Sequence, residues 1–126
     1  MKERDTLRIN ECGHLEIGGC DTVELARKYG TPLYVMDEAY IRKIARGYTD
    51  IMNSDYGDGL ICFASKAFSV KAIYEICKSE GLGADVVSGC ELLTALDAGM
   101  DADNIYFHGN NKSPFELELA VKHGVH

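Results

Sequence analysis

The second half of the sequence repeats one pattern three times: a short apolar run, a loop, and a helical pattern that ends near a glycine. The apolar runs are 60–63, 84–87 and 105–107, and successive runs start roughly 20 to 24 residues apart, about the length of one short β-α unit with its loops. Repeated β-α units imply a parallel sheet with right-handed crossovers. The pattern therefore predicts an α/β fold, and both an open doubly wound sheet and a barrel are compatible with it.

The last two residues, Val125 and His126, fit the start of a fourth strand. A (β/α)₈ barrel needs about 250 residues, whereas this chain has 126. We therefore expect the N-terminal portion of a larger protein, with about three β-α units. A complete small flavodoxin-like domain is the alternative, although such a domain would not be expected to end on the first residues of a strand.

Two elements are predicted at the N-terminus. Residues 7–17 alternate apolar and polar side chains on either side of a Cys-Gly pair, which predicts a hairpin or two short strands. Such a hairpin is marginal by itself in water and needs more sheet or a partner. Residues 21–30 predict a short helix, because Asp21 is followed three residues later by a glutamate and Gly30 is a typical helix end.

The middle of the chain predicts a strand and a long helix. Residues 33–36 form a short apolar run, and Asp37 can cap the helical pattern that follows it. The stretch 53–59 is rich in turn residues and separates this helix from the β-α repeats. We accordingly expect two regions: 1–30, an N-terminal β segment with a short helix, and 31–126, an incomplete β-α domain.

Two helices of the repeats carry clear start signals. Ser88 is followed by Glu91, and Ser113 by Glu116, which is the spacing of a capping box. Pro114 then occupies the first helical position, where its missing N–H is not needed. These signals predict helices that begin after Ser88 and after Ser113.

Composition argues against several classes of partner. The formal net charge is -7 and no stretch concentrates lysine or arginine, so neither nucleic acid nor an anionic membrane surface is expected as a partner. The charged N-terminus lacks the apolar region of a signal peptide, and no apolar run is long enough to cross a bilayer. The five cysteines are odd in number and none are spaced C-x-x-C, which favours a reducing compartment. We expect a cytoplasmic protein that handles small molecules.

Lys66 lies where the first apolar run of the repeats ends. A short uninterrupted apolar run predicts a strand buried on both faces, and ligands bind at the carboxyl ends of parallel strands. An amine there is costly unless it is paired or chemically used; the alternative is a lysine that extends into solvent from the loop. Asp85, in the second run, can point toward it. A desolvated lysine amine attacks carbonyls and forms Schiff bases, whereas a nearby carboxylate favours the ammonium form.

Other chemistries have weaker support. No G-x-G-x-x-G or P-loop pattern is present, so nucleotide binding is not expected. The histidines are scattered and no helix pairs two of them with a carboxylate, so we expect no metal site. The serines that follow the strands, Ser65 and Ser88, have no base at a recognisable spacing and fit turn and cap roles.

Three motifs resemble one enzyme family: Phe-Ala-Ser-Lys-Ala at 63–67, Gly-Ala-Asp-Val-Val-Ser-Gly-Cys-Glu-Leu at 83–92, and Phe-His-Gly-Asn-Asn-Lys-Ser at 107–113. In this order and spacing they resemble the N-terminal motifs of the diaminopimelate decarboxylases. That family belongs to the alanine-racemase-like (fold type III) pyridoxal phosphate enzymes, as do the ornithine and arginine decarboxylases. The resemblance runs from about residue 31 to the end of the chain.

The resemblance implies a fold, a cofactor and site residues. The fold would be the N-terminal part of a (β/α)₈ TIM barrel, with the first strands joining a C-terminal β domain. Lys66 would carry pyridoxal 5'-phosphate as a Schiff base, Asp85 would lie beside it, and His108 would form a wall of the cofactor pocket. The reaction would be decarboxylation of meso-diaminopimelate to L-lysine, the last step of lysine biosynthesis, by a homodimer.

The resemblance also has departures and gaps. The family often has asparagine where this chain has Phe68 and glycine where it has Cys90, which puts in doubt a polar contact from position 68. The family's phosphate-binding loop, the partner of its pyridine nitrogen and its substrate contacts lie in later parts of the family's polypeptides, and none of them is expected within these 126 residues. A related ornithine, arginine or carboxynorspermidine decarboxylase is therefore an alternative. A further alternative is that the 126 residues alone are inert and self-associate.

Overall fold

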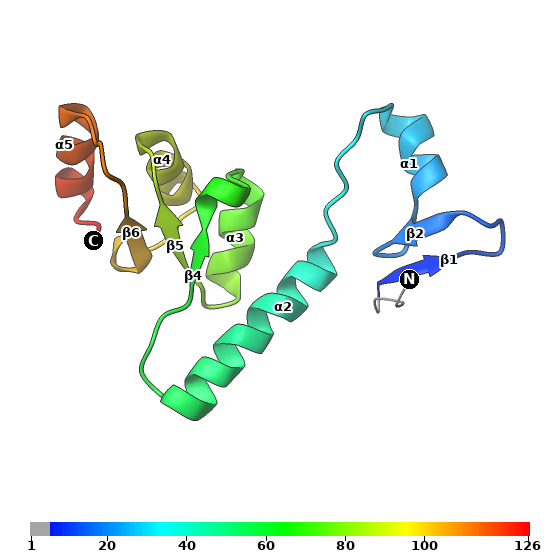
Figure 1. The fold of residues 1–126 in the computed structure, drawn as a ribbon, viewed down its shortest axis with the longest axis horizontal. Helices are drawn as coiled ribbons and strands as arrows, with labels where there is room; N and C mark the ends of the chain where they lie inside the picture. The colour runs from blue at the N-terminus through cyan, green and yellow to red at the C-terminus, as the bar shows by residue number, and fades with distance from the viewer. Residues whose placement is uncertain (1–5) are drawn as a thin grey trace. The chain divides into compact units, whose positions relative to one another are not determined.

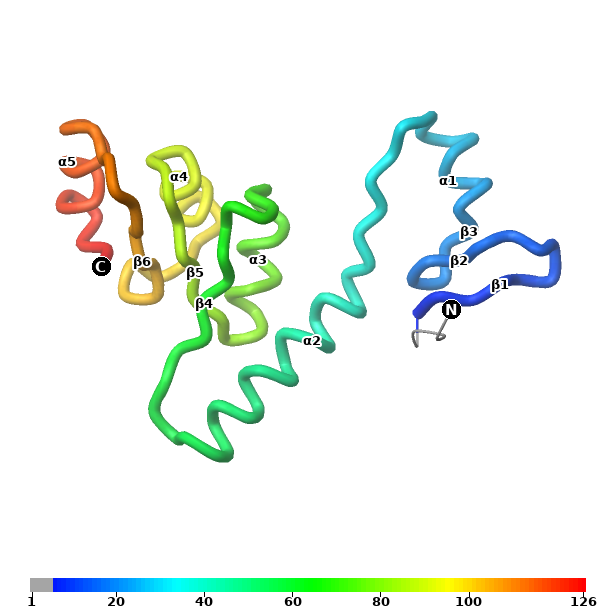
Figure 2. The backbone as a smooth tube through the Cα atoms, viewed as in Figure 1, coloured from blue at the N-terminus to red at the C-terminus, as the bar shows by residue number. Residues whose placement is uncertain are grey.

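The computed structural model describes residues 6–126. These residues form two compact units, one extending to Ile44 and the other comprising Ala45–His126, and each is described by itself below. Figure 1 shows their helices and strands, and Figure 2 traces the same backbone as a tube.

The N-terminal unit contains a small antiparallel sheet. Strands β1 (Leu7–Ile9) and β2 (Leu15–Ile17) pair with Leu7 opposite Ile17, which confirms the predicted hairpin. A short third strand, β3 (Cys20–Asp21), pairs with the other side of β2 and was not predicted from the sequence. The third strand gives the hairpin the additional pairing that an isolated hairpin lacks.

Helix α1 (Thr22–Tyr29) follows β3 directly. The Asp21 carboxylate accepts hydrogen bonds from the backbone N–H groups of Val23 and Glu24, at 2.8 and 3.3 Å. The helix ends at Gly30, whose φ of 81° is a conformation that a side chain rarely adopts. The predicted helix and both of its end signals are therefore confirmed.

The predicted strand at 33–36 is wrong. These residues are extended but belong to neither sheet, and the side chain of Tyr34 is 92% exposed. The physical reason is that a strand requires a hydrogen-bonded neighbour, and no described residue pairs with this segment. Helix α2 (Glu38–Ile51) begins after Asp37 as expected and continues into a π-helical turn at Met52–Tyr56, where a turn-rich break was predicted.

The C-terminal unit contains a parallel sheet with the order β4-β5-β6, flanked by helices. Its strands are β4 (Cys62–Ala64), β5 (Gly83–Val86) and β6 (Ile105–Phe107). Its helices are α3 (Lys71–Ser79), α4 (Gly89–Asp97) and α5 (Pro114–His123), with 3₁₀ turns at Ser65–Ala67 and Ala102–Asn104. The three predicted β-α units are confirmed, with β4 starting two residues later than expected.

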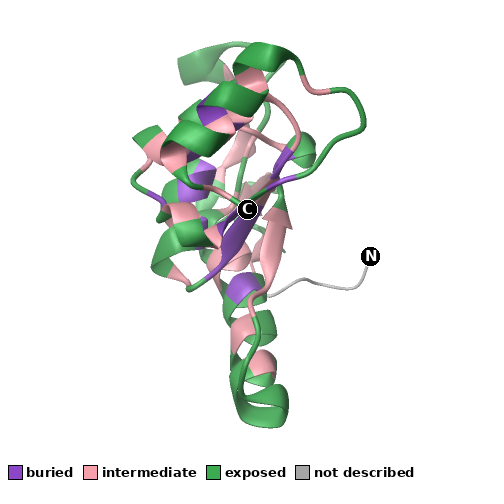
Figure 3. Cartoon of the chain, turned by 90° about the vertical axis from the view of Figure 1, so that its left-hand side faces the viewer, coloured by how far each residue is buried: buried purple, intermediate pink, exposed green. Residues whose placement is uncertain are grey.

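The core of this unit lies between one face of the sheet and the helices. Ala84 and Val86 of β5 and Ile105 of β6 are fully buried, as is Leu92 of α4. Figure 3 colours the buried residues purple, and they lie along the sheet and on the adjoining helices. On the opposite face of the sheet, Tyr106 is 43% exposed. The expectation of a strand buried on both faces, made for the first apolar run, is therefore wrong, because the residues of β4 are half-buried or exposed.

A fourth strand position begins at the end of the chain. The Phe107 N–H donates to the His126 carbonyl at 2.7 Å, and the His126 N–H donates to the Ile105 carbonyl at 3.1 Å. This is the ladder of a parallel neighbour centred on Tyr106. The predicted start of a strand at residues 125–126 thus has its backbone partner in β6.

Candidate functional site

The carboxyl ends of β4, β5 and β6 open onto three adjacent loops, because parallel strands end at the same edge of a sheet. The loops are 65–70, 87–88 and 108–113, and we call them together the rim. Each includes part of one of the three sequence motifs. The rim is the position in the described chain that its fold makes available for ligand chemistry.

Lys66 lies in the 3₁₀ turn that directly follows β4. Its side chain is exposed, so the expected desolvated amine is not found in this structure. The amine makes no hydrogen bond or ion pair within residues 6–126.

Asp85 lies on the uncovered face of the sheet. The register pairs it with Ala64 on one side and Tyr106 on the other, while its chain neighbours face the buried core. One carboxylate oxygen, Oδ1, is buried and has no hydrogen-bond partner. An unpartnered buried carboxylate oxygen is costly, so this oxygen is a position where a donor group of a ligand would be stabilising.

The thiol of Cys62 lies in the electrostatic field of the Asp85 carboxylate. Burial, and then the negative charge of Asp85, raise the pKa of the Cys62 thiol above its ordinary value. The two side chains project from the same face of neighbouring strands, two register positions apart. Their coupling indicates that the field of Asp85 acts across the uncovered face of the sheet.

Ser65, the first residue of the first rim loop, also has a buried polar atom without a partner. Its side chain is fully buried, and its hydroxyl oxygen has no hydrogen-bond partner within the described chain. The sequence predicts only a turn role for this residue. Its neighbour in the chain is Lys66, so two of the three buried side-chain atoms without a partner, those of Ser65 and Asp85, belong to this part of the fold.

His108 is exposed at the start of the third loop. Its backbone N–H donates to the Val86 carbonyl at 3.0 Å, which ties the loop to β5. Within the described chain its ring makes no hydrogen bond or ion pair with Lys66 or Asp85. The fold therefore gathers all three predicted residues at one sheet edge, without direct bonds between their side chains.

Two residues of this region were not singled out from the sequence. The Tyr106 ring stacks on the His126 ring, with centroids 4.9 Å apart and planes 19° from parallel. The two-residue period of β6 could have placed Tyr106 on the face of Asp85. Glu116 was predicted only as a helix cap, yet its carboxylate reaches the Gly89 N–H of the neighbouring unit at 2.8 Å. No sequence spacing signals that second contact.

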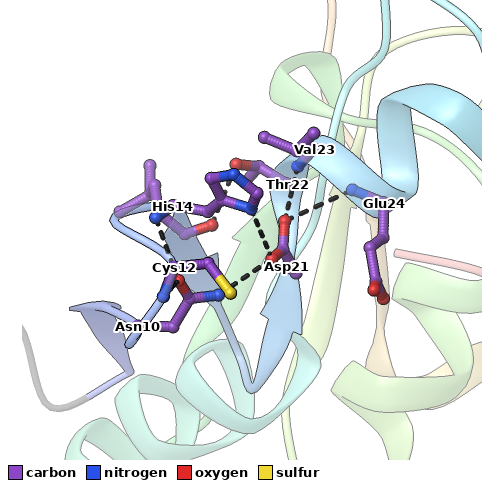
Figure 4. A network of polar contacts seen from close by, with 8 residues as sticks. Asn10, Cys12, His14, Asp21, Thr22, Val23 and Glu24 are labelled. Carbon is purple, nitrogen blue, oxygen red and sulfur yellow. Dashed lines mark hydrogen bonds and ion pairs between the residues drawn. The ribbon is translucent and has the colours of Figure 1, made fainter.

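A separate polar cluster lies in the N-terminal unit (Figure 4). The Asp21 carboxylate accepts from Asn10 and contacts the His14 ring nitrogen Nδ1, both at 2.8 Å. A pocket of about 570 Å³ in the same unit is lined partly by Ile17, Leu25 and Met36. The cluster fixes the start of α1, and neither feature contains a predicted site residue.

No helix of the described residues is both long and apolar enough to cross a membrane. Within residues 6–126 no group of three histidine, cysteine, aspartate or glutamate side chains is arranged to hold a metal ion.

Curated relatives resemble nearly the whole chain. The chain is 54% identical over 120 residues to a diaminopimelate decarboxylase of Bacillus methanolicus, which covers 95% of this chain and 28% of that protein. It is 51% identical over 120 residues to the diaminopimelate decarboxylase of Bacillus subtilis, covering 95% and 27% respectively. The chain thus spans little more than a quarter of the length of these relatives.

A solved structure of a diaminopimelate decarboxylase is also similar to nearly the whole chain. A diaminopimelate decarboxylase of M. jannaschii in complex with L-lysine superposes with a TM-score of 0.83 at 34% identity, covering 96% of this chain and 29% of that one. A family model described as the pyridoxal binding domain of pyridoxal-dependent decarboxylases matches residues 39–126. The chain belongs to the family of pyridoxal-dependent decarboxylases, and residues 39–126 belong to their pyridoxal binding domain.

Proposed function

We propose that this chain supplies the cofactor-bearing lysine of a diaminopimelate decarboxylase, acting as the N-terminal part of a longer polypeptide. The reaction removes carbon dioxide from meso-diaminopimelate and yields L-lysine. The proposal is supported by the relatives' names, by the cofactor of the family and by the rim. The observation that carries it is the unengaged Lys66 amine at the carboxyl end of a parallel strand beside Asp85.

The rim residues fit pyridoxal phosphate in part. The Lys66 amine is a nucleophile that can form a covalent bond to a carbonyl carbon. The buried Asp85 Oδ1 lacks a donor, which a cationic or hydrogen-bonding part of the cofactor would provide. His108 is exposed on the third loop and can cover one side of the ring.

The described rim is less suited to the cofactor phosphate. Helix N-termini commonly bind phosphate, but the Val87 and Gly89 N–H groups at the start of α4 already donate to carboxylates. Glu91 accepts from Val87 at 2.6 Å, and Glu116 accepts from Gly89 at 2.8 Å. Two carboxylates at this position also repel an anion. The phosphate therefore binds to residues that follow this segment in the longer polypeptide.

When bound, pyridoxal phosphate withdraws electrons from the substrate α-carbon, so that carbon dioxide can leave. Lys66 would hold the cofactor through its side-chain amine. When it is not bonded to the cofactor, that amine could hold or deliver a proton at the sheet edge. Asp85 stabilises positive charge in the same region, and His108 limits the approach of water to the ring.

The chain's place in the whole protein follows from the same proposal. The three β-α units form the start of a (β/α)₈ barrel whose interior is the uncovered sheet face. Residues 6–30 join a C-terminal β domain, and 31–126 form the cofactor-binding part of the barrel; residues 1–5 of the predicted N-terminal region lie outside the described residues. The complete enzyme is a cytoplasmic homodimer that takes a small amino acid as its substrate.

The test is a substrate comparison on the full-length gene product that contains these residues. Carbon dioxide release is measured with pyridoxal phosphate and meso-diaminopimelate, and then with ornithine, arginine and carboxynorspermidine. The proposal requires turnover of meso-diaminopimelate, which Lys66→Ala abolishes. Turnover of another amine alone would replace the substrate and keep the reaction class. Absence of any decarboxylation in a cofactor-loaded, folded protein would overturn the proposal.

A further inference from the structure

We propose that Glu116 is a positioning residue that clips the third loop of the rim onto the second and thereby holds Asp85 and His108 in place. This inference rests on the proposed function, because it assigns a task within that site. Glu116 does not touch the sheet edge itself. It acts through the backbone of the two loops that carry the site residues.

The clip consists of one carboxylate shared between two helix starts. Glu116 Oε2 accepts from the Ser113 N–H and hydroxyl, both at 2.9 Å, as expected for a capping box within α5. Its other oxygen, Oε1, accepts from the Gly89 N–H, the first residue of α4, at 2.8 Å. A cap for α5 needs only the first set of bonds. The second bond spans 27 positions in sequence and joins two β-α units.

Gly89 is the matching half of the clip. A Cβ at position 89 would lie 3.1 Å from the Glu116 Cγ, closer than an ordinary van der Waals contact. Gly89 is buried and Glu116 is half-buried. A side chain at position 89 would therefore force the Glu116 side chain to shift by a few tenths of an ångström.

The clip is close in sequence to the site residues. Three residues separate Asp85 from Gly89, and one of them, Val87, donates its N–H to Glu91 at 2.6 Å. On the third loop, the His108 N–H is bonded to the Val86 carbonyl at 3.0 Å. A shift of Gly89 would thus move the strand end that carries Asp85 and also the attachment point of His108.

Charge supports the same role. Glu116 lies at the N-terminal ends of two helices, where a negative charge is stabilised by their unpaired N–H groups. The bonds from Ser113 and Gly89 hold the pKa of the Glu116 carboxyl below its usual range. The carboxylate is therefore ionised, with both oxygens engaged, at every pH where a decarboxylase would work.

The experiment compares four variants of the full-length protein with the wild type: E116A, G89A, the double variant G89A/E116A, and E118A. Glu118 lies on the same helix and is exposed, so E118A is the matched control. The measurements are kcat and KM for carbon dioxide release, the circular dichroism of the bound cofactor, the unfolding temperature, and the exchange rate of the Gly89 amide proton.

We expect E116A and G89A each to lower kcat by about 10-fold, because a misplacement of the order of 1 Å costs up to about 100-fold. KM should change less than kcat, and the cofactor dichroism should change. The double variant should be no slower than E116A alone, since the methyl group added by G89A has nothing to displace once Glu116 is truncated. E118A should match the wild type, and Gly89 amide exchange should accelerate in E116A only.

Independent, multiplying effects of G89A and E116A would overturn the inference, and so would an E116A variant with wild-type kcat. A loss of unfolding temperature with kcat per folded molecule unchanged would also overturn it, because it would mean a purely structural cap. If the wild type releases no carbon dioxide, the proposed function is wrong, and the exchange rate of the Gly89 amide proton then tests the clip independently of activity. An exchange rate in E116A equal to that of the wild type would show that Glu116 does not hold the Gly89 N–H.

Discussion

Single residues of the candidate site differ in how far the sequence could place them. Lys66 could be placed at a strand end because an apolar run stops there, and β4 does end just before it. The sequence left open whether its side chain is desolvated or extends into solvent, and the structure shows it exposed. The orphaned Asp85 oxygen follows from strand alternation together with the absence of a donor on neighbouring strands.

The Asp85 charge should be measurable through Cys62. We expect Asp85→Asn to lower the pKa of the Cys62 thiol, because removing a nearby negative charge favours the thiolate. The pKa should stay above its ordinary value, since burial is the larger cause and remains. The measurement is the pH dependence of alkylation at Cys62, mapped by mass spectrometry. Asp97→Asn is the control, because Asp97 pairs with Lys71 on the protein surface; equal shifts in both variants would contradict the coupling.

The Asp21 cluster predicts a pH dependence in the N-terminal unit. Bonds from His14, Asn10 and two backbone N–H groups lower the pKa of Asp21 from 3.8 to about 2. A lowered folded-state pKa means that its contribution to stability is complete above about 3.8 and disappears as the pH falls through about 2. We expect an NMR titration of the Asp21 carboxyl to have its midpoint near 2, and Asn10→Ala to raise it. A midpoint at 3.8 or above would show that the cluster does not form.

At the scale of elements, local signals were reliable where the bonds that they predict are local. The capping box of α5 is present in full. Ser88 caps α4 as predicted, because its hydroxyl accepts from the Glu91 N–H. The Glu91 carboxylate, however, accepts from the Val87 N–H and not from the Ser88 N–H. The predicted strand at 33–36 was wrong because a strand needs a hydrogen-bonded neighbouring strand, and a local sequence pattern carries no information about that neighbour. The link from Glu116 to Gly89 was missed for the same reason.

The orientation of α4 gives a stability test. Leu92 is fully buried, whereas the next residue, Leu93, is 44% exposed. We expect Leu92→Ala to reduce the free energy of unfolding by about 2–5 kcal/mol, because it removes apolar contacts and leaves a cavity. Leu93→Ala should cost about 1 kcal/mol or less. Denaturant unfolding measures both, and equal losses would mean that α4 faces the sheet differently.

At the scale of the whole molecule, the described chain leaves much apolar surface without a partner. On α5, Phe115 is 63% and Val121 is 83% exposed, and Leu119 is the helix's buried residue. In addition, β4 has a hydrogen-bonded strand on one side only. Exposed apolar patches and open strand edges favour association. The sequence predicted this outcome in general, but the location of the patches required the structure.

We therefore expect the 126-residue chain to associate with itself as its concentration rises. Val121→Glu should weaken the association without lowering the unfolding temperature, because this side chain is exposed. Asn53→Glu adds the same charge at an exposed position outside the patch and is the control. Sedimentation velocity across a concentration series measures the effect. A wild-type chain that stays monomeric throughout would contradict the prediction.

The most direct test of the central claim is to find where pyridoxal phosphate attaches. The protein is incubated with the cofactor, reduced with borohydride, digested and mapped by mass spectrometry, with Lys66→Ala and Lys71→Arg as matched variants. The account predicts a modified Lys66 in the wild type and in Lys71→Arg, and loss of the modification in Lys66→Ala. Attachment to a different lysine in the wild type, retained when Lys66 is replaced, would contradict it.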